Sequence, residues 1–365
     1  MVPFALACAA AGHEVRVAAP MPFAAAVTHA GFDHVPLASP AEAELASIFA
    51  ALPRLSLEES NALVMREVFA GLDARAALPG MAAAVGDWRP ELIMRETAEF
   101  SSYVVAEAEG IPHVQVAMGM TVIEEFAYVL IDDALAALGS RSGTAALRTA
   151  PVLSLVPECL EDPDSRTVRS VHRFRDRLVN TGTDLGDWWT GIDAPLVYVT
   201  FGTVAASMGL FPDLYRAAIA AVADLPVRAL VTLGEAGDPD ILGSLPANVH
   251  VERYWPQHAI LPHTAAMVGH GGFGTTMAGL ARAVPMVVVP LFALDQHYNA
   301  RAVARAGAGI ALTEGPAAIG ELGPALERVL ADHTYVVGAR TVAADIARLP
   351  DATRSVALLE EIASQ

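Results

Sequence analysis

Short apolar runs alternate with longer stretches of helical period along both halves of this 365-residue chain. The apolar runs are rich in valine and are bounded by proline or glycine, a pattern typical of buried parallel strands joined by helices. A chain of this length exceeds one compact core and suits two domains. We therefore expect an α/β protein of two doubly wound, Rossmann-like domains that face each other across a cleft.

The first half is expected to hold four strands and four helices, after which the periodicity fades. The strands are expected over residues 14–19, 34–36, 91–95 and 113–116, and the helices over 24–30, 61–85, 101–109 and 122–138. Between Gly139 and Ile192 we expect a linker with a partly ordered loop. No apolar run reaches the roughly 18 residues that span a bilayer.

The chain opens on an apolar helix with no strand before it. In α/β proteins such a helix follows a buried strand, so we expect a first strand and its loop to be missing ahead of Met1. A signal peptide is the alternative, but no basic residue precedes the apolar run, and Gly12 is typical of a helix C-cap.

The second half alternates more clearly. Strands are expected over 195–200, 228–233, 249–252, 266–268, 286–289 and 309–312, and helices over 212–223, 275–282, 296–306 and much of 316–362. We predict a first domain over residues 1–180, a second domain over 181–345, and a final helix over 346–365 that packs back toward the first domain.

The composition excludes several kinds of chemistry. The net charge of -18 disfavours a nucleic-acid or anionic-membrane partner. All 23 basic residues are arginine, which excludes Schiff-base lysine chemistry and a Walker-type phosphate lysine. The two cysteines, Cys8 and Cys159, lie far apart, which excludes a disulfide framework and fits a reducing cytoplasm.

The strongest motif is the glycine-rich run from Val268 to Thr276, between a short apolar strand and a helix. Glycines let the backbone approach a ligand, and a helix N-terminus offers unpaired N–H groups with partial positive charge. The run therefore favours a diphosphate cradle without lysine or metal. His270 could donate to a phosphate, or could be a packed strand-end residue. Thr275 and Thr276 could instead cap the helix, and a dinucleotide site is a competitor.

Two further strand ends carry candidate ligands. Asp295 and Gln296 can hold vicinal sugar hydroxyls, although an N-capping Asp is an equal alternative. Tyr254 and Trp255, followed by Gln257, could stack on a nucleobase or simply fill a corner.

Other features are weaker candidates. The Asp-Pro-Asp triplets at 162–164 and 238–240 match a metal-binding pattern but flank prolines in polar loops. The five arginines between 166 and 177 favour a solvated linker face over an anion site. We expect Trp188 and Trp189 to anchor the linker. Ordinary core packing explains Met118, Met120, Phe126 and Tyr128.

Together these residues resemble family 1 glycosyltransferases of the GT-B fold, especially actinobacterial enzymes that decorate natural products. The family's donor signature stands here as His270-Gly271-Gly272-Phe273-Gly274-Thr275, Ala283-Val284-Pro285, Pro290, Asp295-Gln296 and Asn299-Ala300. Only Ala283 departs, where the family has glycine. Phe201-Gly202-Thr203 resembles the family's turn in which a hydroxyl meets the diphosphate, and Tyr254 falls at its base-stacking position. The resemblance covers nearly the whole chain and is weakest over 139–192.

The resemblance implies an inverting, metal-independent glycosyltransferase that uses no cofactor besides its nucleotide sugar. The donor, dTDP- or UDP-linked, would meet Gly202, Thr203, Tyr254, Trp255, Gln257, His270, Gly271, Gly272, Gly274, Thr275, Asp295 and Gln296. The nucleotide sugar would bind the domain over 181–345. The acceptor, a small apolar molecule, would bind the domain over 1–180, where Met118, Met120, Phe126 and Tyr128 fit an apolar pocket by family position. Glu96 stands where the family has a carboxylate that orients the base, and a solvated glutamate at a strand end is the alternative. The base histidine belongs to a loop absent from this chain, and neither His13 nor His29 replaces it.

Three hypotheses follow. The first is the enzyme itself, cytoplasmic, without nucleic-acid or membrane partners, and possibly a homodimer. The second is a non-catalytic partner protein of the same fold that activates another transferase, suggested by the absent base. The third is a dinucleotide-dependent oxidoreductase, which would need an acidic residue about 20 residues past the glycine-rich loop. Asp295 lies near that distance. The residues after Asp295, however, match the sugar-binding pattern instead.

Overall fold

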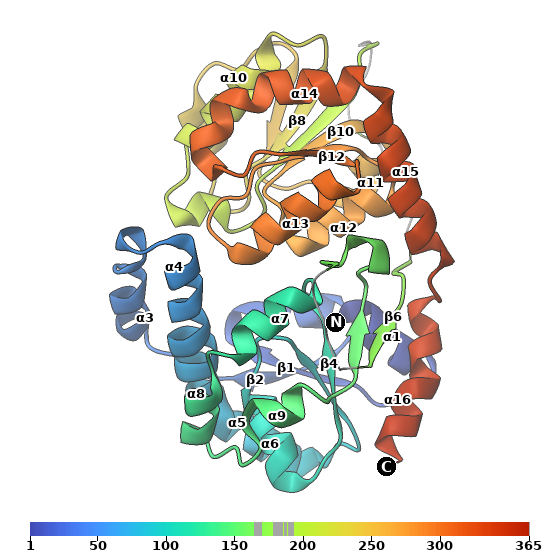
Figure 1. Cartoon of the computed structure of the whole chain (residues 1–365). Helices are drawn as coiled ribbons and strands as arrows, with labels where there is room; N and C mark the ends of the chain where they lie inside the picture. Colours follow the sequence, from blue (N-terminus) through green and yellow to red (C-terminus); the bar gives the residue numbers. More distant parts are fainter. Residues whose placement is uncertain (164–169, 178–184, 186–187, 189–192, 365) are drawn as a thin grey trace. The chain divides into compact units, whose positions relative to one another are not determined.

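The computed structural model describes residues 1–163, 170–177, 185, 188 and 193–364. The chain folds into two compact units (Figure 1). The first unit contains Met1–Leu155, Asp162–Arg177 and Leu349–Gln365, and the second contains Val156–Glu161 and Leu178–Arg348. The domain boundary predicted at residue 180 falls outside the described residues.

The second unit is built on one six-stranded parallel sheet in the order β12-β11-β10-β7-β8-β9. Its strands are β7 (Leu196–Thr200), β8 (Arg228–Thr232), β9 (Val249–Glu252), β10 (Thr264–Gly269), β11 (Met286–Val288) and β12 (Gly309–Ala311). Every residue of β7 is buried, as the continuous apolar run predicts for a central parallel strand. The helices are α10 (Asp213–Ala223), α11 (Gln257–Ile260), α12 (Phe273–Ala281), α13 (Leu294–Arg305), α14 (Leu322–Ala331) and α15 (His333–Arg348).

The strands of the first unit form two separate parallel sheets. One pairs β1 (Arg16–Pro20) with β2 (Asp33–Leu37), and the other runs through β3 (Ile93–Glu96), β4 (His113–Val116), β5 (Val152–Ser154) and β6 (Val171–Arg173). The helices include α1 (Val2–Ala10), α2 (Ala24–His29), α3 (Glu42–Phe49), α6 (Ser101–Glu109) and α16 (Ser355–Ala363). Helix α16 packs against α1, and Leu359 and Ile362 share a core with Phe4 (Figure 1).

Part of the expected linker is regular structure. Residues 143–147 form helix α9 (Gly143–Leu147), and β5 and β6 extend the sheet from β4. The expectation of a linker was wrong there because three-residue strands are too short to show a period, while their burial depends on distant neighbours: Val152 and Leu153 are fully buried. The helix expected over 122–138 is divided into α7 (Thr121–Tyr128) and α8 (Asp132–Ala137).

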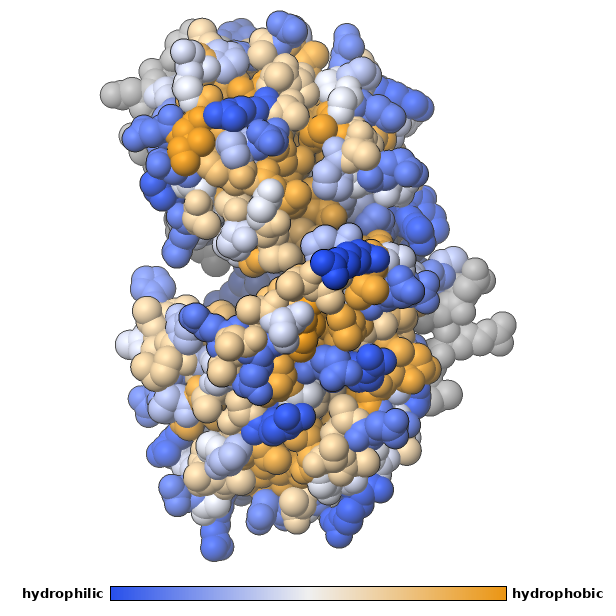
Figure 2. Space-filling model, turned by 90° about the vertical axis from the view of Figure 1, so that its left-hand side faces the viewer, coloured by the Kyte–Doolittle hydropathy of each residue, from blue (hydrophilic) through white to orange (hydrophobic). Residues whose placement is uncertain are grey.

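One helical stretch of the first unit is long. Helix α4 (Leu57–Leu63), the π-helical η3 (Val64–Asp73) and α5 (Ala74–Trp88) run continuously from Leu57 to Trp88, and by length and composition alone this stretch could cross a membrane. Charged residues such as Arg66, Glu67 and Asp73 interrupt the stretch, so it contains no uninterrupted apolar run of 18 residues. A core helix passes the same test, and this one contributes Ala70, Met81 and Val85 to two buried clusters. On the face shown in Figure 2, hydrophilic residues are scattered among apolar ones over both units.

Candidate diphosphate-binding site

The candidate site lies at the centre of the second unit's sheet. Strands β7 and β10 are neighbours, but the chain continues from β7 to β8 and β9 on one side and from β10 to β11 and β12 on the other. The strand order therefore reverses between β7 and β10, and ligands of doubly wound sheets bind at the carboxyl ends of the strands at such a switch point. The loops that follow these two strands are Phe201–Thr203 and His270–Gly272.

The glycine-rich loop turns sharply from β10 into α12. Gly271 has a φ of 85°, and a Cβ atom there would lie 2.6 Å from the carbonyl oxygen of Gln296. Helix α12 begins at Phe273 with Gly272 as its N-cap, two residues earlier than the sequence suggested. Neither Thr275 nor Thr276 is therefore the cap. Gly274 is exposed, so the tip of this nine-residue helix is open to a ligand.

His270 lies between two glycines. A Cβ atom at Gly202 would come within 2.7 Å of the imidazole Cε1, and one at Gly272 would collide with Nε2. Within the described residues, the buried Nδ1 has no hydrogen-bond partner. Burial lowers the pKa of His270 to about 4, so the ring is neutral at neutral pH and can donate one N–H without carrying a charge.

The segment after β9 also reaches this edge of the sheet. The Gln257 side chain donates from Nε2 to the Thr275 hydroxyl at 3.0 Å, which ties the start of α11 to the first turn of α12. Tyr254 is 69% exposed, so it does not fill a corner, and its ring is open to stacking. Trp255 is half-buried and meets Trp188 edge to face, with ring centroids 5.9 Å apart.

Trp188 stacks on His250 of β9 in addition to its edge-to-face contact with Trp255. Its ring lies parallel to the His250 ring of β9, with centroids 4.7 Å apart. This placement agrees with an anchoring role for the linker tryptophan, whereas Trp189 lies outside the described residues.

Helix α13, which follows β11, begins two residues earlier than expected. Asp295 and Gln296 lie in the first turn of α13, whose N-cap is Ala293, so the capping interpretation of Asp295 was wrong. Burial raises the pKa of Asp295. The Gln296 Oε1 atom accepts from the backbone N–H groups of Leu291 (2.8 Å) and Phe292 (3.2 Å), so this oxygen shapes the loop after β11.

One supporting residue was missed by the sequence reasoning. Asn299 is buried on α13 and donates from Nδ2 to the carbonyl oxygen of Gly271 at 2.7 Å. Its position in the Asn-Ala pair of the signature was the available clue, but only the fold shows that it holds the glycine-rich loop.

The metal-pattern aspartates have other partners. Asp238 accepts from the Asp240 amide at 3.3 Å and pairs with Arg253 at 3.3 Å. Asp164 lies outside the described residues. In the part of the chain that the structure describes, no group of three His, Cys, Asp or Glu side chains could hold a metal ion.

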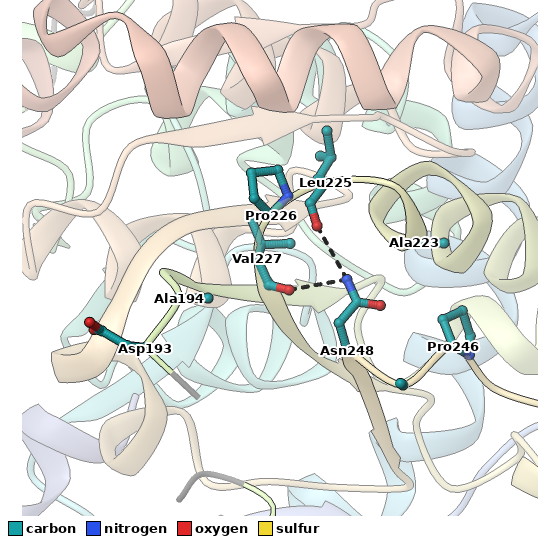
Figure 3. A pocket seen from close by; sticks show the side chains of 9 residues that line it. Asp193, Ala194, Ala223, Leu225, Pro226, Val227, Pro246 and Asn248 are labelled. Atoms are coloured by element: carbon teal, nitrogen blue, oxygen red, sulfur yellow. Dashed lines mark hydrogen bonds between the residues drawn. The ribbon is translucent and has the colours of Figure 1, made fainter. Parts of the chain in front are cut away.

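A shallow hollow of about 500 Å³ lies at the opposite edge of the same sheet (Figure 3). The Asn248 side chain lines this hollow and donates from Nδ2 to the carbonyl oxygens of Val222 (3.1 Å), Leu225 (3.4 Å) and Val227 (3.0 Å). These bonds join the end of α10 to the starts of β8 and β9, which is a structural role remote from the glycine-rich loop.

In the first unit, Glu96 ends β3. Its Oε2 atom accepts from the Ala98 amide at 2.9 Å, and burial raises its pKa. Within the described residues Glu96 has no hydrogen bond or ion pair with a histidine, and His13 pairs instead with Glu360 at 3.1 Å.

The loop that follows Glu96 is held by Arg95, a second residue that the sequence reasoning missed. Arg95 is 2% exposed, and its guanidinium donates to the carbonyl oxygens of Glu96, Thr97 and Glu99 and to the side chain of Gln115. A charged arginine within a short apolar strand was the available clue, because a buried charged group is tolerated only with several partners.

The remaining candidates belong mainly to the core or to ion pairs. Met120 and Tyr128 are buried, as core packing predicted, and Met118 is 43% exposed. Of the five arginines, Arg175 and Arg177 lie 3.7 Å and 4.0 Å from Asp351, and Arg166 and Arg169 fall outside the described residues.

The parallel sheet, the switch point and the glycine-rich loop define the second unit as an α/β unit of the nucleotide-binding type. Two family models match the chain: the N-terminal domain of erythromycin biosynthesis protein CIII-like proteins at residues 6–132, and the C-terminal domain at 216–362. The L-demethylnoviosyl transferase of Streptomyces niveus is 30% identical over 358 residues, which cover 96% of this chain and 91% of that protein.

Solved structures agree. The glycosyltransferase SnogD from Streptomyces nogalater is 26% identical, with a TM-score of 0.77 over 99% of this chain and 94% of that one. The glycosyltransferase VinC, solved in complex with DTDP, is 24% identical, with a TM-score of 0.77 over 100% of this chain and 96% of that one, and shows the shared fold. The chain belongs to the family 1 natural-product glycosyltransferases with the GT-B fold, and it is a glycosyltransferase of antibiotic biosynthesis.

Proposed function

We propose that this glycosyltransferase moves a sugar from a dTDP- or UDP-linked donor to a hydroxyl of a small apolar natural product, with inversion and without a metal ion. The observation that carries the proposal is the open tip of α12 at the switch point, beside the neutral, buried His270. Two similar structures support the nucleotide: VinC was solved with DTDP and SsfS6 with thymidine diphosphate.

The chemistry needs charge stabilisation at the leaving group. The acceptor oxygen forms a bond to the anomeric carbon while the bond from that carbon to the diphosphate oxygen breaks, through an oxocarbenium-like transition state. The electron pair of the broken bond stays on the nucleoside diphosphate. We assign its stabilisation to the N–H groups at the start of α12, to His270 and to Thr203. Attack from the face opposite the leaving group inverts the anomeric carbon.

The other candidate residues bind rather than react. Tyr254 is assigned to stacking on the nucleobase, and Asp295 with Gln296 to the hydroxyls of the sugar. The acceptor proton passes to a base, which Glu96 orients. No cofactor besides the nucleotide sugar is needed. The cytoplasmic location and the homodimer are predictions from the sequence.

Calorimetry tests this proposal directly. We expect dTDP or UDP to bind the chain, and Asp295→Ala to weaken binding of dTDP-glucose by roughly tenfold or more while leaving dTDP within about twofold, because the carboxylate meets the sugar alone. Asp213→Ala, at an exposed position on α10, is the matched control. If neither nucleotide binds, the proposal is wrong.

A non-catalytic partner of another transferase is the second candidate, favoured by the lack of a histidine partner for Glu96 in the described residues. A sugar-transfer assay with a panel of hydroxylated apolar acceptors separates the two. Transfer that is lost in Asp295→Ala supports the enzyme. Tight dTDP binding without transfer supports the partner.

A further inference from the structure

Strand β7 carries different chemistry on its two faces. Val197 and Val199 belong to the large apolar cluster of the second unit. The side chains that alternate with them, Tyr198 and Thr200, lie on the opposite face, and both are buried. A buried hydroxyl group is costly unless it is hydrogen-bonded. The partners of these two side chains therefore indicate why this central strand is not apolar throughout.

The Tyr198 phenol is the centre of a buried hydrogen-bond network. Its Oη atom lies 3.1 Å from the Oγ1 atom of Thr232, and the side chains of Thr200 and Gln257 also hydrogen-bond to it. Thr200 and Thr232 are paired directly across β7 and β8, at the carboxyl ends of both strands. Burial raises the pKa of Tyr198, so the phenol keeps its proton and can both donate and accept.

Two of these partners each hold one loop of the candidate site. The Thr200 hydroxyl accepts from the backbone N–H of Gly202 at 3.4 Å, in the loop that follows β7. The Gln257 side chain donates to the Thr275 hydroxyl at 3.0 Å, in the first turn of α12. The Tyr198 phenol thus joins the loop after β7 to the tip of α12, through one intermediate side chain on each side.

A diphosphate needs donors that are held at a fixed separation, because its two phosphate groups meet different parts of the site. Donors that are fixed before binding cost no reorganisation when negative charge develops on the leaving group. Phenylalanine at position 198 would fill the same space in the core but would leave the two loops unconnected. The hydroxyl group is therefore the part of Tyr198 that matters to the site.

We propose that Tyr198 is a positioning residue of the donor site, whose hydroxyl group fixes the loop after β7 and the tip of α12 relative to each other. Tyr198 acts through Thr200 and Gln257 rather than by touching the nucleotide. The identity of the ligand rests on the proposed function, whereas the coupling of the two loops is a property of the unliganded chain.

The test compares two substitutions that each remove one phenolic hydroxyl group. Tyr198→Phe removes the hydroxyl that joins the loops. Tyr103→Phe is the matched control, because the buried Tyr103 donates to the carbonyl oxygen of Gly143 at 2.7 Å, in the first unit. A third variant, Gln257→Leu, breaks the connection to α12 alone.

Hydrogen exchange in the unliganded protein, followed by NMR, reads each loop through one hydrogen-bonded amide. These are Gly202, which donates to Thr200, and Thr276, which donates to the Gly272 carbonyl oxygen at 3.0 Å. We expect Tyr198→Phe to speed exchange of both amides about fivefold, Gln257→Leu to speed that of Thr276 alone, and Tyr103→Phe to change neither. Unchanged exchange in Tyr198→Phe, or an equal increase in Tyr103→Phe, would overturn the proposal.

Calorimetry then measures the consequence for binding. We expect Tyr198→Phe to weaken dTDP binding about fivefold and to leave thymidine within about twofold, because the nucleoside lacks the diphosphate. Tyr103→Phe should leave both within about twofold. Equal losses for dTDP and thymidine would overturn the positioning role. Failure of the unsubstituted chain to bind dTDP would contradict the proposed function, and the exchange rates would still decide whether Tyr198 couples the loops.

Discussion

At the scale of single residues, the glycine-rich loop is shaped by side chains that are distant in sequence. Asn299 holds the carbonyl of Gly271, and Gln257 holds the hydroxyl of Thr275. Neither bond follows from a local pattern, because each joins residues on different elements. The amides at the tip of α12 are therefore set by the fold around them as well as by the glycines.

Replacing Asn299 tests this support. We expect Asn299→Ala to weaken dTDP binding roughly tenfold, because the Gly271 carbonyl loses its donor and the loop loosens. Thymidine binding should change far less, since the nucleoside lacks the diphosphate. Asn248→Ala is the matched control, because it removes a half-buried amide that bonds to carbonyl groups at the opposite edge of the same sheet. It should lower stability and leave the dTDP affinity within about twofold. Equal losses for dTDP and thymidine would contradict the role of Asn299.

His270 gives a pH dependence of stability with a defined sign. Its folded pKa of about 4 is below the ordinary 6.5, so between these values the unfolded chain binds more protons and stability falls as the pH falls. We expect this group to remove about 2 kcal/mol of unfolding free energy between pH 7 and pH 5. Urea unfolding of His270→Gln should show a shallower loss over that range. An unchanged slope would contradict the buried, neutral ring.

At the scale of elements, the strands of the second unit were predicted well from the sequence, whereas β5 and β6 were missed and helix starts were placed too late. The buried valine runs of β7, β8 and β11 were evident because a central parallel strand is apolar throughout. The starts of α12 and α13 came two residues earlier than expected. In both, the N-cap, Gly272 or Ala293, makes no side-chain capping bond, so the usual sequence marker of a helix start is absent.

The turn into α12 depends on one glycine more than on its neighbours. We expect Gly271→Ala to lower stability by about 1–3 kcal/mol and to weaken dTDP binding at least tenfold, because the position has positive φ and its Cβ would meet the Gln296 carbonyl. Gly86→Ala, in open space within α5, is the control and should leave dTDP binding unchanged. Thermal unfolding and calorimetry measure both effects. Normal dTDP binding by Gly271→Ala would contradict the cradle.

At the scale of the whole molecule, the proposed chemistry uses only fixed dipoles and neutral donors. We therefore expect EDTA to leave the dTDP dissociation constant and the sugar-transfer rate within about twofold of their values in magnesium. Calorimetry and a product assay with and without EDTA measure this. A tenfold or larger loss on chelation would show that a cation shares the diphosphate, and the metal-free mechanism would be wrong.

The family, the two-unit α/β plan and the glycine-rich loop could all be inferred from the sequence. Each of these rests on local periodicity or fixed spacing, which neighbouring residues carry by themselves. Tertiary structure alone decided the switch point between β7 and β10, the supports Asn299 and Arg95, and the strands β5 and β6. Each of these depends on which distant segments lie side by side. Burial and strand pairing between distant segments cannot be inferred from any short stretch of sequence.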